Sequence, residues 1–233
     1  MKKLKSQVTS HKSQVLGRAR ISAAILCILC AMLYTFFLSG CAKKDIKNIA
    51  SQGLNIICYG DSITFGYGAG QGEDFPSLLA KLVNLPVINV GIDGDTTSEG
   101  LKRIHSDVLD RDPFLVIIEF CGNDFLRKVP IEETVKNVTE MIDKIEANGA
   151  MVALVDISAG LLLQDYRKQF RKIARQKNVI FIPGILSGIV TNPSLKSDFL
   201  HPNASGYNMI AQKIYRAILP YLQKNKLARI VKK

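Results

Sequence analysis

The chain has 233 residues, 47% of them hydrophobic, which is enough for one domain with a substantial buried core. Its formal net charge of +11 suggests a nucleic-acid partner, but the excess lies mainly near the two ends, and no basic stripe is interleaved with aromatic residues. We therefore expect no nucleic-acid partner and interpret the basic ends as solvated flanks.

Residues 1–41 are predicted to be a targeting signal outside the fold. They contain six Lys and Arg residues and no acid, and the run from Ile21 to Leu38 has no charged residue. The run closes with Leu38-Ser39-Gly40-Cys41, which resembles the lipobox of bacterial lipoproteins, in which the cysteine is lipidated and becomes the mature N-terminus. The alternative is an uncleaved membrane anchor, because the run approaches spanning length.

Either reading tethers the domain to a membrane of the bacterial cell envelope, outside the cytoplasm. Ala42 rather than Asp follows the cysteine, which favours the outer membrane in a host with two membranes. Outside residues 1–41 only Cys58 and Cys121 remain. Both lie at ends of expected core strands, where free buried cysteine is common, although a disulfide would be permitted outside the cytoplasm. No Cys/His cluster has metal-ligand spacing, so we expect no metal site and no cofactor.

From residue 54 onward, continuous apolar runs alternate with amphipathic stretches. The expected strands are Leu54–Tyr59, Val87–Val90, Phe114–Phe120, Met151–Asp156 and Val179–Ile182. The expected helices cover Phe75–Val83, Ser98–Leu109, Ile131–Ile145, Tyr166–Gln176 and Ala204–Leu219. This alternation predicts a doubly wound α/β domain with five parallel strands over residues 54–222, preceded by a tether at 42–53 and followed by a basic tail at 223–233.

The main chemical signal is Gly60-Asp61-Ser62-Ile63-Thr64, directly after the first expected strand. Ser62 would stand at a strand-to-helix turn on the carboxyl edge of the sheet, where open α/β sheets bind ligands. Free backbone N–H groups and the positive end of a helix dipole suit a nucleophile that generates an oxyanion.

A serine nucleophile needs a base and donors for the oxyanion. His201 follows Asp198 by three residues, close enough in a turn for the carboxylate to orient the imidazole, whereas His105 is expected on a helix surface. Oxyanion donors would be the N–H of Ser62, the N–H of Gly94 and the amide of Asn123, since Gly94 and Asn123 follow the next two strands.

Together these blocks, over residues 54–221, resemble the SGNH, or GDSL, hydrolase family. Three of the chain's motifs are most similar to the thioesterase, lysophospholipase and arylesterase branch of the family: Gly94-Asp95-Thr96, Gly122-Asn123-Asp124 and His201-Pro202-Asn203. The resemblance implies a flavodoxin-like three-layer α/β/α sandwich and two-step acyl transfer to water without a cofactor. It also implies the same catalytic and oxyanion roles for these residues.

The chain departs from the family pattern at Cys121, where the family usually has glycine. The thiol would narrow the oxyanion region or make it sensitive to oxidation, or it is a tolerated small substitution. Gly66, Gly68, Gly70 and Gly72 crowd the loop after Ser62, which is interpreted as a flexible wall of the site or an irregular surface loop.

Apolar residues after the fourth and fifth strands could line an acyl pocket or pack as a satellite core: Leu161, Leu162, Ile185 and Ile189. The leading prediction is a membrane-anchored serine esterase that acts on acyl esters or thioesters, with lysophospholipids among the candidate substrates. One alternative is an O-acetyl esterase acting on envelope polysaccharide or peptidoglycan, and another is a catalytically silent binding lipoprotein. The sequence does not determine the oligomeric state.

Overall fold

The computed structural model describes residues 45–231. The predicted targeting segment, with Cys41, lies outside these residues. Within them, no helix is both long and apolar enough to cross a bilayer.

Five parallel strands form one sheet in the order β2-β1-β3-β4-β5. Their bounds are Asn55–Gly60 for β1, Val87–Asn89 for β2, Pro113–Glu119 for β3, Met151–Val155 for β4 and Ile180–Ile182 for β5. The central strands are buried along their whole length, which explains their continuous apolar runs.

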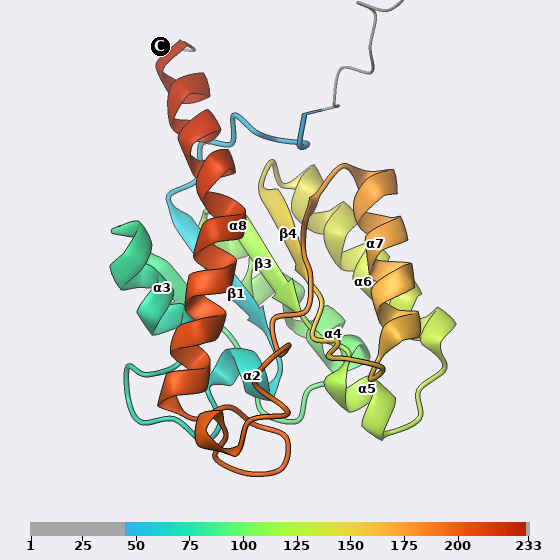
Figure 1. Cartoon of the computed structure of the whole chain (residues 1–233). Helices are drawn as coiled ribbons and strands as arrows, with labels where there is room; N and C mark the ends of the chain where they lie inside the picture. Colours follow the sequence, from blue (N-terminus) through green and yellow to red (C-terminus); the bar gives the residue numbers. More distant parts are fainter. Residues whose placement is uncertain (1–44, 232–233) are drawn as a thin grey trace, which may run out of the picture. The chain divides into compact units, whose positions relative to one another are not determined.

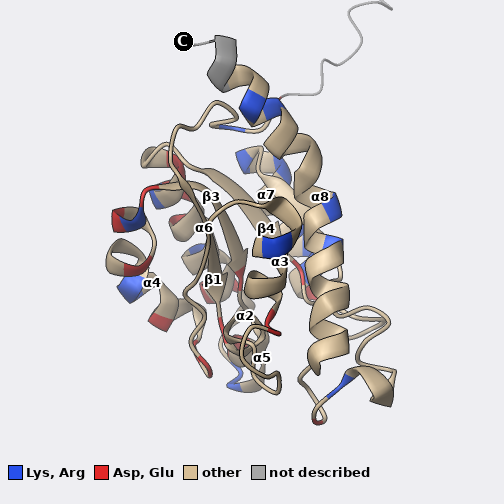
Figure 2. Cartoon of the chain, turned by 90° about the vertical axis from the view of Figure 1, so that its left-hand side faces the viewer, with Lys and Arg blue, Asp and Glu red and all other residues tan. Residues whose placement is uncertain are grey.

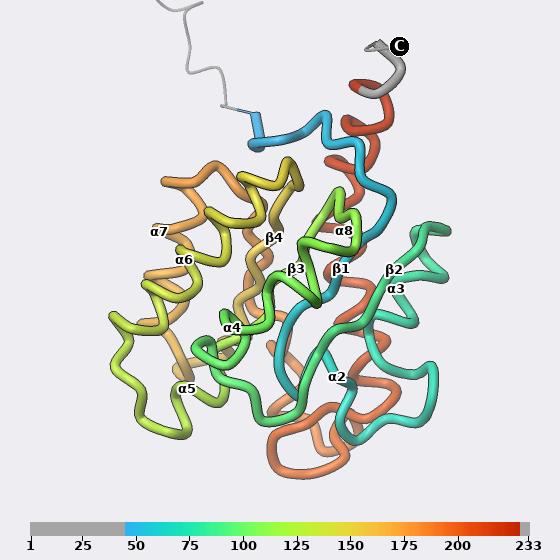
Figure 3. The backbone as a smooth tube through the Cα atoms, turned by 180° about the vertical axis from the view of Figure 1, so that it is seen from behind, coloured from blue at the N-terminus to red at the C-terminus, as the bar shows by residue number. Residues whose placement is uncertain are grey.

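Helices cover both faces of the sheet. Their bounds are Ser62–Phe65 for α2, Phe75–Val83 for α3, Thr97–Asp107 for α4, Gly122–Leu126 for α5, Ile131–Ala147 for α6, Gln164–Lys177 for α7 and Ala204–Val231 for α8. Short 3₁₀ turns occupy Leu109–Arg111 and Pro193–Leu195. Helices α3 and α8 pack together on one face (Figure 1), while α4, α6 and α7 cover the other (Figure 3). The predicted three-layer sandwich is confirmed.

The strand order places a topological switch beside β1. The chain moves outward from β1 to β2 and then crosses back to β3, so the loops after β1 and β3 diverge to opposite faces of the sheet. Open α/β sheets bind ligands at the carboxyl end of such a switch. Ser62 follows β1 and Asn123 follows β3, so both lie at this position.

The structure differs from the expected tether, because residues 45–53 pack on the domain. Asn48 donates to the carbonyl oxygens of Glu146 and Ala150 at 2.8 and 2.9 Å, and Lys47 pairs with the Glu146 carboxylate at 2.8 Å. Nothing in the local sequence of this segment predicts these contacts, because their partners lie about a hundred residues away.

The expected basic tail also differs, since residues 223–231 extend α8 past Pro220. The added turns are held by Asn225, whose amide donates to the carbonyl oxygens of Ile49 and Ser51 at 2.9 and 3.0 Å. Lys224 pairs with Asp45 at 2.8 Å. The described residues of α8 include lysine and arginine but no acid, and the ribbon of this helix accordingly has blue segments (Figure 2).

Candidate active site

Ser62 is the first residue of α2 and is 8% exposed. The Asp61 side chain caps this one-turn helix by accepting from the Ile63 N–H at 3.2 Å. The turn is tight at Gly60, where an added Cβ would come within 2.1 Å of Thr64 Oγ1 and 2.3 Å of the Glu119 carbonyl oxygen. A side chain at Gly60 would therefore displace the turn that carries Ser62.

Ser62, His201 and Asp198 form a continuous hydrogen-bonded relay. Ser62 Oγ lies 3.1 Å from His201 Nε2, and His201 Nδ1 lies 2.8 Å from Asp198 Oδ2. The serine and histidine are 139 positions apart in sequence, so the fold alone brings them together. This is the arrangement in which a histidine can take a serine proton while a carboxylate fixes its tautomer.

The turn at residues 198–201 keeps Asp198 ionised. Partial burial would raise the pKa of this carboxyl, but hydrogen bonds from the His201 backbone N–H, the His201 ring and the Leu200 N–H lower it to about 2. The two backbone bonds are 2.8 and 2.7 Å long and end on Oδ1, which leaves Oδ2 for the imidazole.

An aromatic side chain from the glycine-rich loop covers the imidazole. The Tyr67 ring lies 4.4 Å from the His201 ring, centroid to centroid, and its backbone oxygen accepts from Tyr207 Oη at 2.9 Å. The loop therefore contacts the histidine and is not only an irregular surface loop. We missed Tyr67 at the sequence level, where its only signal is an aromatic residue between two glycines, five positions after Ser62.

The predicted oxyanion donors lie in two loops that contact each other. Asn123 Nδ2 donates to the Asp95 carbonyl oxygen at 3.0 Å, and Gly94 has φ +83°. Ile92 N–H donates to the Gly60 carbonyl oxygen at 3.1 Å, so the loop that carries Gly94 lies beside the nucleophile turn. The Asn123 bond uses one amide proton and leaves the second for a ligand.

Arg103 on α4 connects these loops. Its guanidinium donates to Asp95 at 2.7 Å, to the Val90 carbonyl oxygen at 2.7 Å and to the Gly60 carbonyl oxygen at 3.1 Å. It also lies 4.8 Å from the centre of the Tyr59 ring. A single side chain thus fixes the ends of β1 and β2 relative to each other. Its sequence signal, one arginine on an amphipathic helix, is too common to identify it.

The predicted acyl-pocket residues separate into two groups. Ile185 and Ile189 are buried in the hydrophobic core, so in the structure they pack in the second of the two expected ways, as core residues. Their spacing fits either role, and only packing distinguishes the two. Leu161 and Leu162 are instead exposed on the loop after β4, and Leu161 is 95% exposed.

Large apolar side chains are exposed on the segments that follow the strands at the carboxyl edge, in loops and on the short helices α2 and α5, and we call this set the apolar rim. It consists of Phe65, Tyr67, Ile92, Phe125, Leu126, Leu161, Leu162, Phe199 and Leu200. Members come from the segments after all five strands. Large exposed apolar patches are typical of ligand or interaction surfaces.

Cys121 adopts φ +115°, a conformation that favours glycine, and its side chain is buried. Cys58 and Cys121 are both free thiols. Burial raises the pKa of each well above its usual value. The thiol at position 121 is therefore held neutral within the core.

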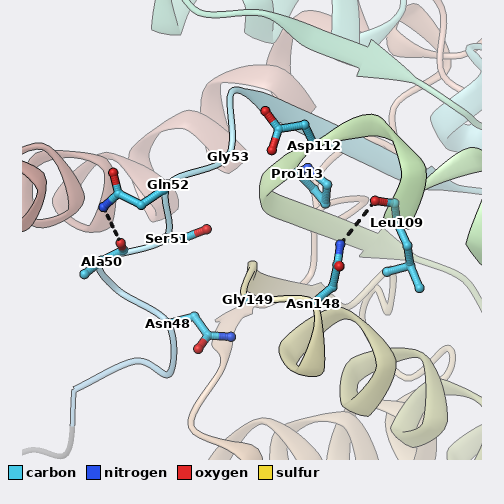
Figure 4. A pocket seen from close by; sticks show the side chains of 10 residues that line it. All are labelled: Asn48, Ala50, Ser51, Gln52, Gly53, Leu109, Asp112, Pro113, Asn148 and Gly149. Carbon is cyan, nitrogen blue, oxygen red and sulfur yellow. Dashed lines mark hydrogen bonds between the residues drawn. The ribbon is translucent and has the colours of Figure 1, made fainter.

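A cavity of about 570 Å³ opens at the opposite, amino edge of the sheet (Figure 4). It is lined by the segment from Asn48 to Gly53 and by the ends of neighbouring loops, including Leu109 and Asn148, which are hydrogen-bonded at 3.2 Å. No histidine or cysteine lines it. Among residues 45–231, no cluster of three or more His, Cys, Asp and Glu side chains could hold a metal ion.

Comparison with known proteins gives consistent matches. The model of the GDSL-like lipase/acylhydrolase family matches residues 58–209. An arylesterase of Vibrio mimicus is 29% identical over 208 residues, covering 83% of this chain and 98% of the relative. The "Thioesterase 1/protease 1/lysophospholipase L1" of Escherichia coli strain K12 is 25% identical over 182 residues, covering 73% and 86%. A crystal structure of the esterase EstA from Pseudoalteromonas sp. has a TM-score of 0.67 at 26% identity, covering 73% of this chain and 99% of EstA.

Proposed function

Because the chain belongs to the GDSL-like lipase/acylhydrolase family and is a serine ester hydrolase, we propose that it cleaves acyl esters through an acyl-enzyme on Ser62. The observation that carries this assignment is the unbroken relay from Ser62 Oγ through the His201 ring to Asp198. Such a relay has no evident use in a protein that only binds its ligand, which argues against a silent binding lipoprotein.

Each residue has one role in the proposed reaction. His201 Nε2 takes the Ser62 proton as Oγ attacks the ester carbonyl carbon, and Asp198 stabilises the imidazolium that forms. The N–H groups of Ser62 and Gly94 and the Asn123 amide receive the charge on the carbonyl oxygen. His201 then protonates the leaving oxygen or sulfur as its bond to carbon breaks. Water then gives a proton to His201 as its oxygen attacks the acyl carbon. The bond from that carbon to Ser62 Oγ breaks, His201 returns the proton to Oγ, and the acid is released.

We place the acyl chain on the apolar rim. Exposed side chains such as Leu161 and Phe199 lie on the loops that follow the strands at the catalytic edge. Burying apolar surface contributes about 25 cal/mol per Å², so a longer acyl chain has more to gain from these loops than acetate does. The relatives named arylesterase and thioesterase/lysophospholipase support aryl esters, thioesters and lysophospholipids as substrates to test.

We also propose that the enzyme is lipidated at Cys41 and faces outward from a membrane of the bacterial envelope. This rests on the charge-free run from Ile21 to Leu38 and the Leu-Ser-Gly-Cys sequence that closes it. Metabolic labelling with an alkyne analogue of palmitate should mark the wild-type protein and not the Cys41→Ala variant. Labelling that persists in the variant would contradict lipidation at this cysteine.

The activity is tested with p-nitrophenyl esters from acetate to palmitate, using Ser62→Ala as control. We expect hydrolysis of medium or long chains that is lost in the variant. Hydrolysis confined to acetate would instead favour deacetylation of an envelope polymer. Equal hydrolysis by wild type and Ser62→Ala would contradict the proposed nucleophile.

A further inference from the structure

Two carboxyl groups are buried together under the turn that carries Ser62. Asp61 precedes the serine and is 1% exposed, and Glu119 ends β3 with no exposed surface. Neither is needed by the reaction proposed above. Burying a charged group is costly unless it is neutralised or well hydrogen-bonded.

In each of the two carboxyl groups, one oxygen accepts hydrogen bonds from the turn and the other does not. Asp61 Oδ1 accepts from the Ile63 N–H, while Glu119 Oε2 accepts from the Thr64 N–H at 3.1 Å and from Thr64 Oγ1 at 2.7 Å. Asp61 Oδ2 and Glu119 Oε1 receive no N–H or O–H from another residue. The two carboxyl groups are close enough for each to shift the pKa of the other. Two ionised carboxylates would only repel each other at this buried position, whereas a proton between them would give both unpartnered oxygens a hydrogen bond.

We propose that Glu119 carries this proton and donates it to Asp61, and that the pair are positioning residues for the Ser62 nucleophile. This inference rests on the proposed function of Ser62. Asp61 caps the start of α2, and Glu119 binds the residue two positions beyond the serine. The proton thus links the two anchor points on either side of Ser62.

The surroundings agree with this placement of the proton. Burial is the main cause that raises both pKa values, and it raises that of Glu119 well above its usual value and that of Asp61 to about 7. The nearby charges of Asp124 and Asp95 contribute to this rise in the pKa of Asp61, while the hydrogen bond from the Ile63 N–H opposes it. Arg103 binds the neighbouring Gly60 carbonyl oxygen, and the Cys121 thiol and Tyr207 hydroxyl nearby have raised pKa values that keep them neutral.

The kinetic test compares Glu119→Gln with Glu119→Leu. Glutamine can still donate to Asp61 and accept from Thr64, so kcat should stay within about threefold of wild type. Leucine leaves a buried carboxylate without its donor, and kcat should fall by about 10- to 100-fold with a smaller change in KM. The matched control is Glu146→Leu, since Glu146 is also buried but pairs with Lys47 at the far edge, and its loss should lower stability without changing kcat.

An infrared measurement on the detergent-solubilised full chain tests the proton itself. At pH 8 the wild type and Ser62→Ala should both show the C=O band of a protonated carboxylic acid, and Glu119→Gln should lack it. A missing wild-type band, or one unchanged in Glu119→Gln, would overturn the proposal even if no ester is hydrolysed. Equal kcat values for the Gln and Leu variants would also overturn it. If Glu119→Leu does not fold, the infrared band of the wild type and its loss in Glu119→Gln still test the proposal.

Discussion

At the residue scale, one short turn provides both the base and the group that orients it. Asp198 receives two backbone N–H groups on one oxygen and the His201 ring on the other. Because these bonds lower the pKa of Asp198 to about 2, the carboxylate stays charged across the neutral range. The imidazole is therefore held in one tautomer whenever His201 is neutral.

Asp198→Asn should lower kcat by about 10⁴, because an amide cannot stabilise the imidazolium and favours the wrong tautomer. A stopped assay with a p-nitrophenyl ester measures this loss. The control is Asp165→Asn, whose carboxylate forms an exposed pair with Lys168. Activity of Asp198→Asn within tenfold of wild type would contradict the assigned role.

Asp198→Asn should also change how the stability of the fold depends on pH. The folded-state pKa of Asp198 is depressed, so its contribution to the free energy of unfolding is present above the unfolded pKa of about 3.9 and is lost as the pH falls toward about 2. Thermal melts should therefore show Asp198→Asn less stable than wild type at pH 6, with the difference shrinking below pH 4. A constant difference from pH 2 to 6 would refute this linkage.

The two domain cysteines should be unreactive in the folded protein. Burial raises the pKa of the Cys58 and Cys121 thiols, and only the thiolate attacks a disulfide reagent. In a Cys27→Ser, Cys30→Ser, Cys41→Ser background, Ellman's reagent at pH 8 should react with neither thiol before unfolding and with both afterwards. Rapid labelling of the folded protein would show that the core around Cys121 opens.

At the element scale, the ends of β1, β2 and β3 carry the site, and α4 holds the first two together through Arg103. The guanidinium bonds to the Val90 and Gly60 carbonyl oxygens add to the backbone bond from the Ile92 N–H to Gly60, beyond the strand pairing that ends at Asn89. Because the side chain is largely buried, its loss removes the donor to the Val90 carbonyl oxygen and leaves the Asp95 carboxylate without its partner.

Arg103→Lys should lower kcat/KM by about tenfold, because an ammonium group cannot reach Asp95, Val90 and Gly60 together. The melting temperature should also fall. Arg111→Lys is the matched control, since Arg103 and Arg111 both pair with Asp107, at 3.0 and 4.0 Å, but Arg111 is more exposed. Equal effects of the two substitutions on kcat/KM would exclude a special role for Arg103.

At the scale of the whole molecule, the catalytic edge and the edge that carries both described chain ends are opposite. The segment at 45–53 and the last turns of α8 meet at the amino edge (Figure 1). The residues of the apolar rim follow the strands, at the carboxyl edge. The rim takes members from segments after all five strands, so it exists only in the folded chain.

Leu161→Ser combined with Phe199→Ser should reduce kcat/KM for long-chain esters by about tenfold or more and leave acetate hydrolysis nearly unchanged, because only long chains gain from apolar contact. The control, Leu54→Ser, replaces an exposed leucine at the opposite edge. A uniform loss across chain lengths would show that the rim does not bind the acyl chain.

Much of the architecture followed from the sequence, because strands buried on both faces must be continuously apolar and helices on the faces must be amphipathic. The runs predicted at Phe114–Phe120 and Met151–Asp156 match β3 and β4 to within one residue at each end. The family could also be predicted from the sequence, since short motifs after successive strands identify it.

Only the tertiary structure decided those features whose contacts come from residues far apart in the sequence. It buried Ile185 and Ile189, exposed Leu161, attached residues 45–53 to the domain and extended α8 beyond Pro220. It also placed Tyr67 on His201 and Glu119 beside Asp61. Local patterns report only whether a side chain suits a strand or a helix, whereas these contacts join segments that the sheet brings together from far apart in the chain.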